Sequence, residues 1–272
     1  MMTFQQTQIA FWEFIRYKQR LGINVMLLYV LESKGSSPGR QGFKMAVAAD
    51  EQFVGSIGGG MMEHKLVELA KATLAGEATS KLFRQVHDAT VSQHRSGMIC
   101  SGEQTVLLHP VRAEDQYLVD QLRDAWEQCT PVRLEITDEG LRLEPAGVIT
   151  DCFYEKIAEN RFVYREYIGF RQVLQIVGGG HCALALSNLM AGMDYYIRVI
   201  DNRPGLSTME ANKVAQERMV IPDYDQLERY CQSGDRVYTV IMTFGFRTDD
   251  QAFRSIAAMP FRYIGMLGSK HK

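Results

Sequence analysis

The sequence predicts an α/β protein in which an N-terminal α+β domain is followed by a doubly wound parallel sheet. From residue 173 onward, short apolar runs alternate with helical patterns, and strands separated by helices form parallel sheets with right-handed crossovers. A glycine turn, Gly178-Gly179-Gly180, joins the first of these strands to its helix. Before residue 170 strands predominate and turns join several of them. We therefore predict two domains, residues 1–170 and 171–272, the second Rossmann-like.

The first domain is predicted to begin with an amphipathic helix that carries Trp12 and Ile15 among polar residues. The apolar run NVMLLYVL at residues 24–31 indicates a buried strand. After the glycine turn at 58–60, Met62 and Leu66 fall on one face of a second helix. The further strands are predicted at 44–50, 53–57, 104–109, 152–157 and 161–168, with a helix at 114–128 and a hairpin at 133–145.

The second domain is predicted as an alternating series that amounts to about one mononucleotide-binding half of a Rossmann fold. Its strands are expected at residues 173–177, 195–200, 218–221, 236–242 and 262–266. Its helices are expected at residues 181–192, 207–216, 223–232 and 248–258.

Composition excludes several classes of protein. The 272 residues carry a net charge of −2, so we expect no nucleic-acid partner. Since no apolar run reaches the roughly 18 residues of a membrane span, we expect no span. The N-terminus lacks the basic start and apolar core of a signal peptide. The five cysteines are far apart and form no CxxC pair, which argues against a disulfide framework or a structural zinc site and favours a cytoplasmic location.

The glycine turn of the second domain is typical of a dinucleotide site. Gly178 permits the tight turn, Gly180 lets the backbone approach a phosphate, and the small Ala183 lets the helix pack against its strand. The N–H groups at the helix start suit a pyrophosphate, and Asp201 ends the next strand where it could accept from ribose hydroxyls. His181 could meet a ligand or cap the helix. The alternative is a Rossmann scaffold whose turn binds nothing.

Four segments together are similar to one family, the XdhC/CoxI proteins, which are accessory factors for xanthine dehydrogenase and related molybdenum hydroxylases. The resemblance covers nearly the whole chain and depends on the order and spacing of the segments. These are GSSPGRQGFKM from Gly35, GSIGGGMMEHKLVE from Gly55, SGMICSG from Ser96, and the Rossmann part from IVGGGHCALAL through VIDNRPG and MTFGFRTDDQAF to YIGMLGSK.

The resemblance implies a protein that binds the molybdenum cofactor, a pterin dithiolene that holds molybdenum and sometimes occurs as its dinucleotide. Such proteins protect the cofactor while a sulfido ligand is installed with the help of a cysteine desulfurase. They then deliver it to the apo-molybdenum hydroxylase. In that case the second-domain turn holds a phosphate or nucleotide part of the pterin cofactor.

The first-domain residues that the resemblance brings into this site suit an anionic ligand. Arg40 and Lys44 flank the first glycine loop, and Ser36 and Ser37 supply hydroxyl groups. The turn Gly58-Gly59-Gly60 matches the family's second glycine segment.

Glu63 and Cys100 match the acidic and cysteine positions of the family. A thiolate suits a soft metal, so Cys100 could bind molybdenum or relay sulfur. Its alternative role is that of a small buried hydrophobe. Glu63 could belong to the site, or could favour the helix N-terminus by its charge.

The chain departs from the family in three places. Met61 stands where many relatives carry cysteine, and Phe244 and Phe246 stand where relatives often place histidine. These side chains cannot ligate the metal as a thiolate or imidazole would. The chain also ends at Lys272, where relatives usually continue for several elements. A role in binding and delivery survives these departures better than a catalytic step.

Two other functions stay open. An NAD(P)-dependent oxidoreductase would use the Rossmann turn, but it needs a proton donor beside the nicotinamide. The sequence offers no clear donor near the expected strand ends, since Asp249 and Asp250 suit the start of a helix. The third possibility is a scaffold whose glycine loops serve a dimer interface. A homodimer is expected in the first and third cases.

Overall fold

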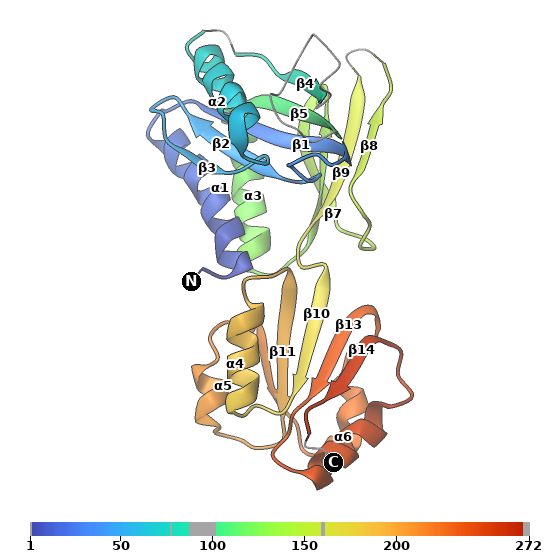
Figure 1. Ribbon diagram of the computed structural model, residues 1–272. Helices are drawn as coiled ribbons and strands as arrows, with labels where there is room; N and C mark the ends of the chain where they lie inside the picture. The colour runs from blue at the N-terminus through green and yellow to red at the C-terminus, as the bar shows by residue number, and fades with distance from the viewer. Residues whose placement is uncertain (1, 77, 87–101, 159–160, 269–272) are drawn as a thin grey trace. The chain divides into compact units, whose positions relative to one another are not determined.

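The computed structural model describes residues 2–76, 78–86, 102–158 and 161–268 (Figure 1). The chain divides into two compact units, Gln8–Gly169 and Phe170–Lys272, and the second also includes Met1–Thr7. We call them the N-terminal unit and the C-terminal unit. The first residues are tied to the C-terminal unit by a hydrogen bond of 2.7 Å from the Phe4 N–H to the Ala191 carbonyl.

The C-terminal unit contains a parallel sheet of five strands in the order β12-β11-β10-β13-β14. The strands are β10 (Gln172–Val177), β11 (Tyr195–Asp201), β12 (Glu217–Val220), β13 (Gly234–Ile241) and β14 (Phe261–Met266). The strand order reverses direction beside β10, which creates the crevice that Rossmann folds use for ligands. The predicted Rossmann-like sheet is confirmed. Its five strands correspond to the five expected from the sequence.

Helical segments cover both faces of this sheet (Figure 1). On one face, α4 (His181–Met190) and α5 (Ser207–Ala211) pack over Leu174, Ile176 and Val199. On the other face, η2 (Tyr224–Arg229) and α6 (Phe246–Ile256) pack over Val177, Ile200 and Ile241. The strands are thus buried on both sides, as their continuous apolar runs indicated.

The sequence prediction was wrong about the extent of one helix in this unit and about the type of another. The helix expected at 207–216 ends at Ala211, because Asn212 leaves the helical region (φ −77°, ψ 74°) and its buried side chain donates to Ser187 Oγ at 2.8 Å. The helix expected at 223–232 is a 3₁₀ helix. Its buried side chains, Tyr224 and Leu227, are three residues apart, a spacing that a 3₁₀ turn places on one face.

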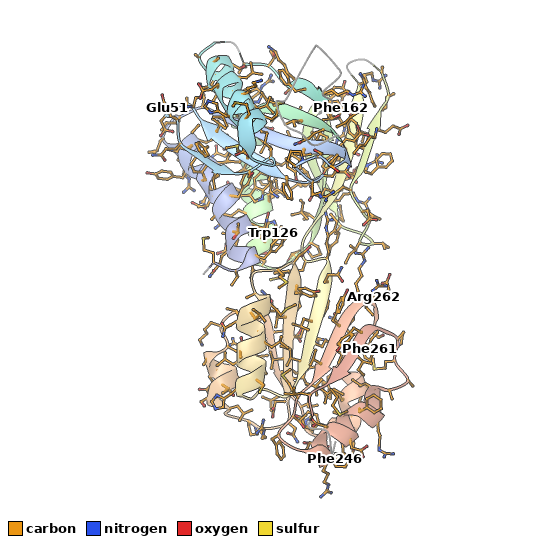
Figure 2. The ribbon with its side chains drawn as sticks, in the orientation of Figure 1. Glu51, Trp126, Phe162, Phe246, Phe261 and Arg262 are labelled. Atoms are coloured by element: carbon orange, nitrogen blue, oxygen red, sulfur yellow. The ribbon has the colours of Figure 1, made fainter. Side chains whose placement is uncertain are left out.

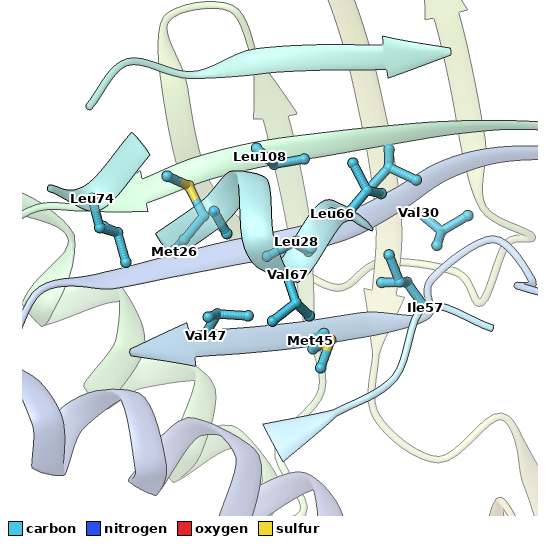
Figure 3. Close-up of a cluster of buried hydrophobic side chains, with 12 residues drawn as sticks. Met26, Leu28, Val30, Met45, Val47, Ile57, Leu66, Val67, Leu74 and Leu108 are labelled. Carbon is cyan, nitrogen blue, oxygen red and sulfur yellow. The ribbon is translucent and has the colours of Figure 1, made fainter. Parts of the chain in front are cut away.

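The N-terminal unit is built on an antiparallel sheet in the order β3-β2-β1-β5-β4. The strands are β1 (Val25–Gly35), β2 (Lys44–Ala48), β3 (Phe53–Gly55), β4 (Lys81–Val86) and β5 (Gly102–Val111). Helix α2 (Gly60–Leu74) covers one face, where Leu66 and Val67 pack on Met26 and Leu28 (Figure 3). Each such side chain contributes about 1.5–3 kcal/mol when fully buried. Our sequence prediction missed β4.

A second antiparallel sheet, in the order β7-β6-β9-β8, packs against the other face of the first. Its strands are β6 (Val132–Thr137), β7 (Gly140–Pro145), β8 (Phe153–Lys156) and β9 (Phe162–Ile168), which include the predicted hairpin. Tyr29 of β1 and Tyr164 of β9 both donate to Glu166 Oε2, at 2.6 and 2.7 Å. Because Glu166 is buried, these bonds satisfy a polar group that would otherwise destabilise the interface between the sheets.

Two helices complete this unit. The predicted N-terminal helix is α1 (Phe4–Arg20), and the predicted helix at 114–128 is η1 (Ala113–Asp115) followed by α3 (Gln116–Glu127). Arg16 of α1 pairs with Asp120 of α3 at 2.9 Å. Both helices bury a tryptophan, Trp12 and Trp126, the latter labelled in Figure 2. Among the helices that the structure describes, none is long and apolar enough to cross a membrane.

Candidate functional site

Three segments that are far apart in the sequence interlock in the N-terminal unit. Ser37, in the first glycine loop, donates to Gln104 Oε1 at 3.0 Å. Gln104, near the start of β5, donates from Nε2 to the carbonyl of Ile57 at 2.9 Å. All three residues are buried. The two glycine segments singled out in the sequence are therefore joined through one amide side chain.

Glycines allow the backbones of these segments to approach closely. Gly58 has φ 128°, and a Cβ built there would lie 2.5 Å from the backbone nitrogen of Gly39. A Cβ on Gly102 would lie 2.6 Å from the nitrogen of Ser37. Real Cβ atoms do not come so near to backbone atoms, and φ 128° disfavours other residues. Gly58 is thus required by the shape of the junction.

Glu63 holds the second glycine turn from the first turn of α2. Its Oε2 accepts from Ser56 Oγ at 2.7 Å and from the N–H groups of Ile57 and Gly59 at 2.9 and 3.0 Å. Partial burial acts to raise the pKa of Glu63, but these hydrogen bonds outweigh it and leave the pKa below its ordinary value. The arrangement resembles the reach-back half of a capping box. Its second oxygen, Oε1, accepts no hydrogen bond from the described residues.

Other predicted residues of this unit face solvent. Ser36, Arg40 and Gly60 are exposed, and the Arg40 guanidinium has no ion pair within the described part of the chain. A Cβ on Gly59 would meet open space. Lys44 is instead placed over the rings of Phe11 and Tyr29, at 5.6 and 5.8 Å. The exposed groups therefore come from the first loop and the start of α2.

Cys100 occupies the position that matches the family's cysteine. Cys100 lies outside the described residues, which resume at Gly102. Met61, which stands in place of the family's cysteine, is 58% exposed at the start of α2.

In the C-terminal unit, the turn Gly178-Gly179-Gly180 follows β10 at the carboxyl edge of the sheet. Gly178 has φ 110°, and a Cβ there would clash with the carbonyl of Met242. The Gly179 N–H donates to Asp201 Oδ2 at 2.6 Å, and the Gly179 carbonyl accepts from Thr208 Oγ1 at 2.5 Å. Side chains from β11 and α5 thus bond to both backbone polar groups of Gly179.

Asp201 is fully buried and is used entirely inside the protein. Its Oδ1 accepts from the N–H and Nε of Arg203, and its Oδ2 accepts from Gly179 and from Arg203 Nη2 at 2.8 Å. Burial acts to raise the pKa of Asp201, but the bonds from Arg203 and Gly179 outweigh it and hold the pKa below its ordinary value. A ribose could reach this carboxylate only after Arg203 moves. We predicted a ribose acceptor at this position, and the structure shows a carboxylate that supports the turn.

The start of α4 remains open beside this turn. Gly180 is the N-cap residue and has no side-chain cap hydrogen bond, and a Cβ there would meet nothing within 4 Å. His181 and Cys182 are exposed, whereas Ala183 is buried against the sheet as its small size predicted. His181 does not cap the helix. The Gly178 and Gly179 N–H groups are bonded to Ile200 and Asp201, so an anion would meet the first N–H groups of α4, which have no intrahelical acceptor.

The phenylalanines that replace the family's histidines are exposed at the same edge of the sheet. Phe244 is 65% and Phe246 62% exposed. The Arg203 guanidinium lies 4.8 Å from the Phe244 ring centre, a cation–π contact. Neither of the following acids caps α6, whose N-cap residue is Gly245. Asp249 accepts from the Thr243 N–H at 2.9 Å, and Asp250 pairs with Arg254.

Sequence reasoning missed three residues that shape these turns: Gln104, Arg203 and Thr208. Arg203 had a local signal, because an arginine two residues after a strand-end aspartate can fold back on it. Gln104 and Thr208 had none, since their partners are 47 and 29 residues away in the chain. No group of three His, Cys, Asp or Glu side chains that could hold a metal ion occurs within the ranges the structure describes.

The fold and its two glycine turns define a two-unit α/β protein with a Rossmann domain at its C-terminal end. The model of the XdhC Rossmann domain matches residues 174–272, and that of the XdhC and CoxI family matches residues 19–85. The chain belongs to the XdhC and CoxI family, which confirms the resemblance of its motifs. Membership supports an accessory role toward xanthine dehydrogenase, and hence a xanthine dehydrogenase partner.

A crystal structure from Bacillus halodurans, described as a xanthine dehydrogenase, has a similar fold. Its TM-score is 0.69 at 22% sequence identity, over 96% of this chain and 82% of that chain. At this identity the likeness shows the fold alone. No curated protein matches the chain significantly.

Proposed function

We propose that the chain binds the molybdenum cofactor, assists its sulfuration and delivers it to an apo-molybdenum hydroxylase of the xanthine dehydrogenase type. The observation that carries the proposal is the match of both units to one accessory-factor family. The structure adds support, because segments that resemble the family's motifs are joined around shared hydrogen bonds in the N-terminal unit.

The exposed groups of the N-terminal unit fit an anionic cofactor. Arg40 supplies a guanidinium, which suits bidentate contact with a phosphate, and Ser36 supplies a hydroxyl group. The first turn of α2 begins at Gly60 without a side-chain cap hydrogen bond. Because Glu63 already holds the preceding turn in place, ligand binding does not have to order the backbone of that turn. When bound, the cofactor supplies molybdenum and a dithiolene; the protein supplies donors and shape.

The C-terminal unit offers a phosphate-binding element of its own. The open start of α4, at Gly180 and His181, suits the phosphate or nucleotide part of a dinucleotide form. Gly178 permits the tight turn, and Asp201 supports it by accepting a hydrogen bond from the Gly179 N–H. We propose that Cys100 supplies the thiolate that binds molybdenum or relays sulfur.

The proposed partners follow from this role. They are the apo-hydroxylase that receives the cofactor and a cysteine desulfurase that supplies sulfur. We further propose that the chain forms a homodimer, which light scattering of the purified protein would test. The NAD(P)-dependent alternative has less support, because the acid expected to bind its ribose is bonded to Arg203 and Gly179.

The test is anaerobic binding of the molybdenum cofactor, with bound molybdenum and pterin measured separately. We would compare the wild type with Cys100→Ala and Arg40→Gln. Cys231→Ala and Arg262→Gln, which lie in the C-terminal unit, serve as matched controls. We expect stoichiometric binding in the wild type and controls, loss of molybdenum in Cys100→Ala, and weaker binding of both components in Arg40→Gln.

An NAD titration of the same samples provides the opposing result. Tight binding of NAD, with no molybdenum or pterin retained by the wild type, would contradict the proposed function and favour the oxidoreductase.

A further inference from the structure

A serine, a histidine and an aspartate form a hydrogen-bonded chain in the N-terminal unit. Ser80 Oγ lies 2.9 Å from His109 Nδ1, and His109 Nε2 lies 3.2 Å from Asp115 Oδ2. Ser80 is exposed, whereas His109 and Asp115 are buried. A hydroxyl group, an imidazole and a carboxylate in this order are the parts of a nucleophile, its base and the group that orients the base.

The pairing of β4 with β5 sets the contact between Ser80 and His109. Lys81, the first residue of β4, pairs with Leu108 of β5. One step back along the chain, the same register places Ser80 opposite His109. Side chains directly opposite each other on antiparallel strands point to the same face of the sheet. The sheet therefore holds the hydroxyl group beside the imidazole, as a catalytic pair requires.

Asp115 determines which nitrogen of His109 can act as a base. Its Oδ2 also accepts from the Arg112 N–H at 2.8 Å. Burial acts to raise the pKa of Asp115, but hydrogen bonds from His109 and Arg112 outweigh it and leave the pKa below its ordinary value. The ionised carboxylate can only accept, so a neutral His109 donates to it from Nε2. The lone pair of the imidazole is then at Nδ1, where it accepts the proton of the Ser80 hydroxyl group.

Ser80 lines a groove of about 730 Å³ between the outer strand of each sheet. Leu82 and Leu107, which are cross-strand partners, form part of its floor. Tyr154 and Phe162 also line it, with their ring centres 6.3 Å apart; Phe162 is labelled in Figure 2. The volume suits a small ligand, and these side chains suit an apolar group beside the serine.

The groove is lined by charged side chains as well. Asp138 and Lys156 are exposed, and Arg84 pairs with Glu103 at 2.7 Å. Charged groups of both signs keep water in the groove. Water is the second reactant when an acyl group is removed from a serine.

We propose that Ser80, His109 and Asp115 form a catalytic triad that hydrolyses a carboxylic ester with an apolar acyl group. Ser80 Oγ bonds to the ester carbonyl carbon and its proton passes to His109 Nδ1. The bond from that carbon to the alcohol oxygen then breaks, and the alcohol leaves with the proton.

Water completes the reaction. A water oxygen bonds to the acyl carbon while its proton passes to His109 Nδ1. The bond from the acyl carbon to Ser80 Oγ breaks, and Oγ takes the proton back. The products are a carboxylic acid and an alcohol, and no oxidant or reductant is consumed. This activity does not depend on the proposed role in cofactor maturation.

Covalent labelling of the full chain with a fluorophosphonate is the test. The reagent phosphonylates an activated serine hydroxyl group with loss of fluoride, and peptide mass spectrometry identifies the labelled residue. We expect the label on Ser80 and not on Thr79, which is the neighbouring exposed hydroxyl group. Hydrolysis of p-nitrophenyl butyrate by the same samples measures turnover.

Three variants separate the triad from ordinary surface chemistry. Ser80→Ala should abolish labelling and remove the ester hydrolysis, and Thr79→Ala should change neither. Both positions are exposed, so unchanged thermal unfolding is the check on folding. Asp115→Asn should slow the labelling of Ser80 by at least about a hundredfold, because an amide favours the wrong tautomer of the histidine.

Two results would overturn the proposal without reference to the buried aspartate. One is a wild type that carries no label on Ser80. The other is Ser80→Ala that hydrolyses the ester as fast as the wild type. A folded Asp115→Asn variant that is labelled at the wild-type rate would overturn it as well.

Discussion

Each unit supports a glycine turn with a carboxylate. The two carboxylates differ in the element that supplies them and in how many of their oxygens already accept hydrogen bonds. Glu63 belongs to the helix that follows its turn and uses one oxygen for three donors. Asp201 comes from the neighbouring strand, is fully buried, and uses both oxygens on Gly179 and Arg203. The first arrangement leaves an acceptor oxygen available at a partly exposed position, and the second leaves none.

This difference decides whether a carboxylate can only stabilise its turn or can also contact a ligand. A carboxylate that is buried and paired with an arginine contributes to the shape of its turn, and a ligand can meet only the backbone beside it. A half-buried carboxylate with an unused oxygen can do both. Substitutions in the two turns can test this distinction.

Gly58→Ala should destabilise the N-terminal unit by about 4 kcal/mol, because a positive φ and a clash with the backbone of Gly39 act together. Gly59→Ala is the matched control. Its Cβ would meet open space, so the cost is that of its backbone conformation alone (φ 75°, ψ −173°), about 2 kcal/mol. Chemical denaturation would measure both. Equal losses would show that the close approach at Gly58 is not a constraint.

Asp201→Asn should destabilise the C-terminal unit by about 3 kcal/mol. The substitution removes the charge that Arg203 and the Gly179 N–H both require. The value lies at the low end for a buried pair, because Arg203 is 36% exposed. Hydrogen exchange of the peptides around Gly179 would report the loss locally. Unchanged protection there would refute the supporting role of Asp201.

Glu63→Gln should cost about 1 kcal/mol, because the amide oxygen can still accept from the turn but without a charge. Thermal unfolding of the variant beside Glu68→Gln, which lies further along α2, would measure this. A loss as large as that of Asp201→Asn would remove the difference between the two turns.

Acid should remove both contributions. Each carboxyl has a folded-state pKa below its unfolded value, so its contribution is present above the ordinary carboxyl pKa of about 4 and is lost as the pH falls through the folded pKa. The stability difference between wild type and Glu63→Gln should therefore shrink below about pH 4. Denaturation at a series of pH values would test this. A difference that grew on acidification would contradict the assigned direction.

Arg40→Gln should change the free energy of unfolding by less than about 0.5 kcal/mol, since the side chain is exposed and unpaired in the described part of the chain. Its effect should appear in cofactor binding alone. A clear loss of stability would show that Arg40 has a structural role and would weaken its place in the proposed site.

Periodicity was enough to predict the parallel sheet, because its strands are continuous apolar runs between helices. It was also enough to find both glycine turns. It failed for β4, because the residues of this strand, KLFRQV, do not alternate between apolar and polar side chains. It failed at Tyr224–Arg229 as well, because apolar residues three apart fit an α-helix and a 3₁₀ helix alike.

The candidate site was less accessible to sequence reasoning. The spacing of Asp201 after the glycine turn was correct for a ribose acceptor, but it could not show that Arg203 folds back on the carboxylate. Ser37 was expected among exposed donors, yet it is buried on Gln104.

Gln104 makes the two ends of the junction between the glycine segments chemically different. One planar amide offers an acceptor to Ser37 and a donor to the Ile57 carbonyl, so each neighbour is matched to one end of it. A glutamate in its place would set a negative oxygen against that carbonyl, and a leucine would leave both neighbours buried without a partner. The contacts among loop, strand and turn at this junction therefore depend on the donor and acceptor ends of a single amide side chain.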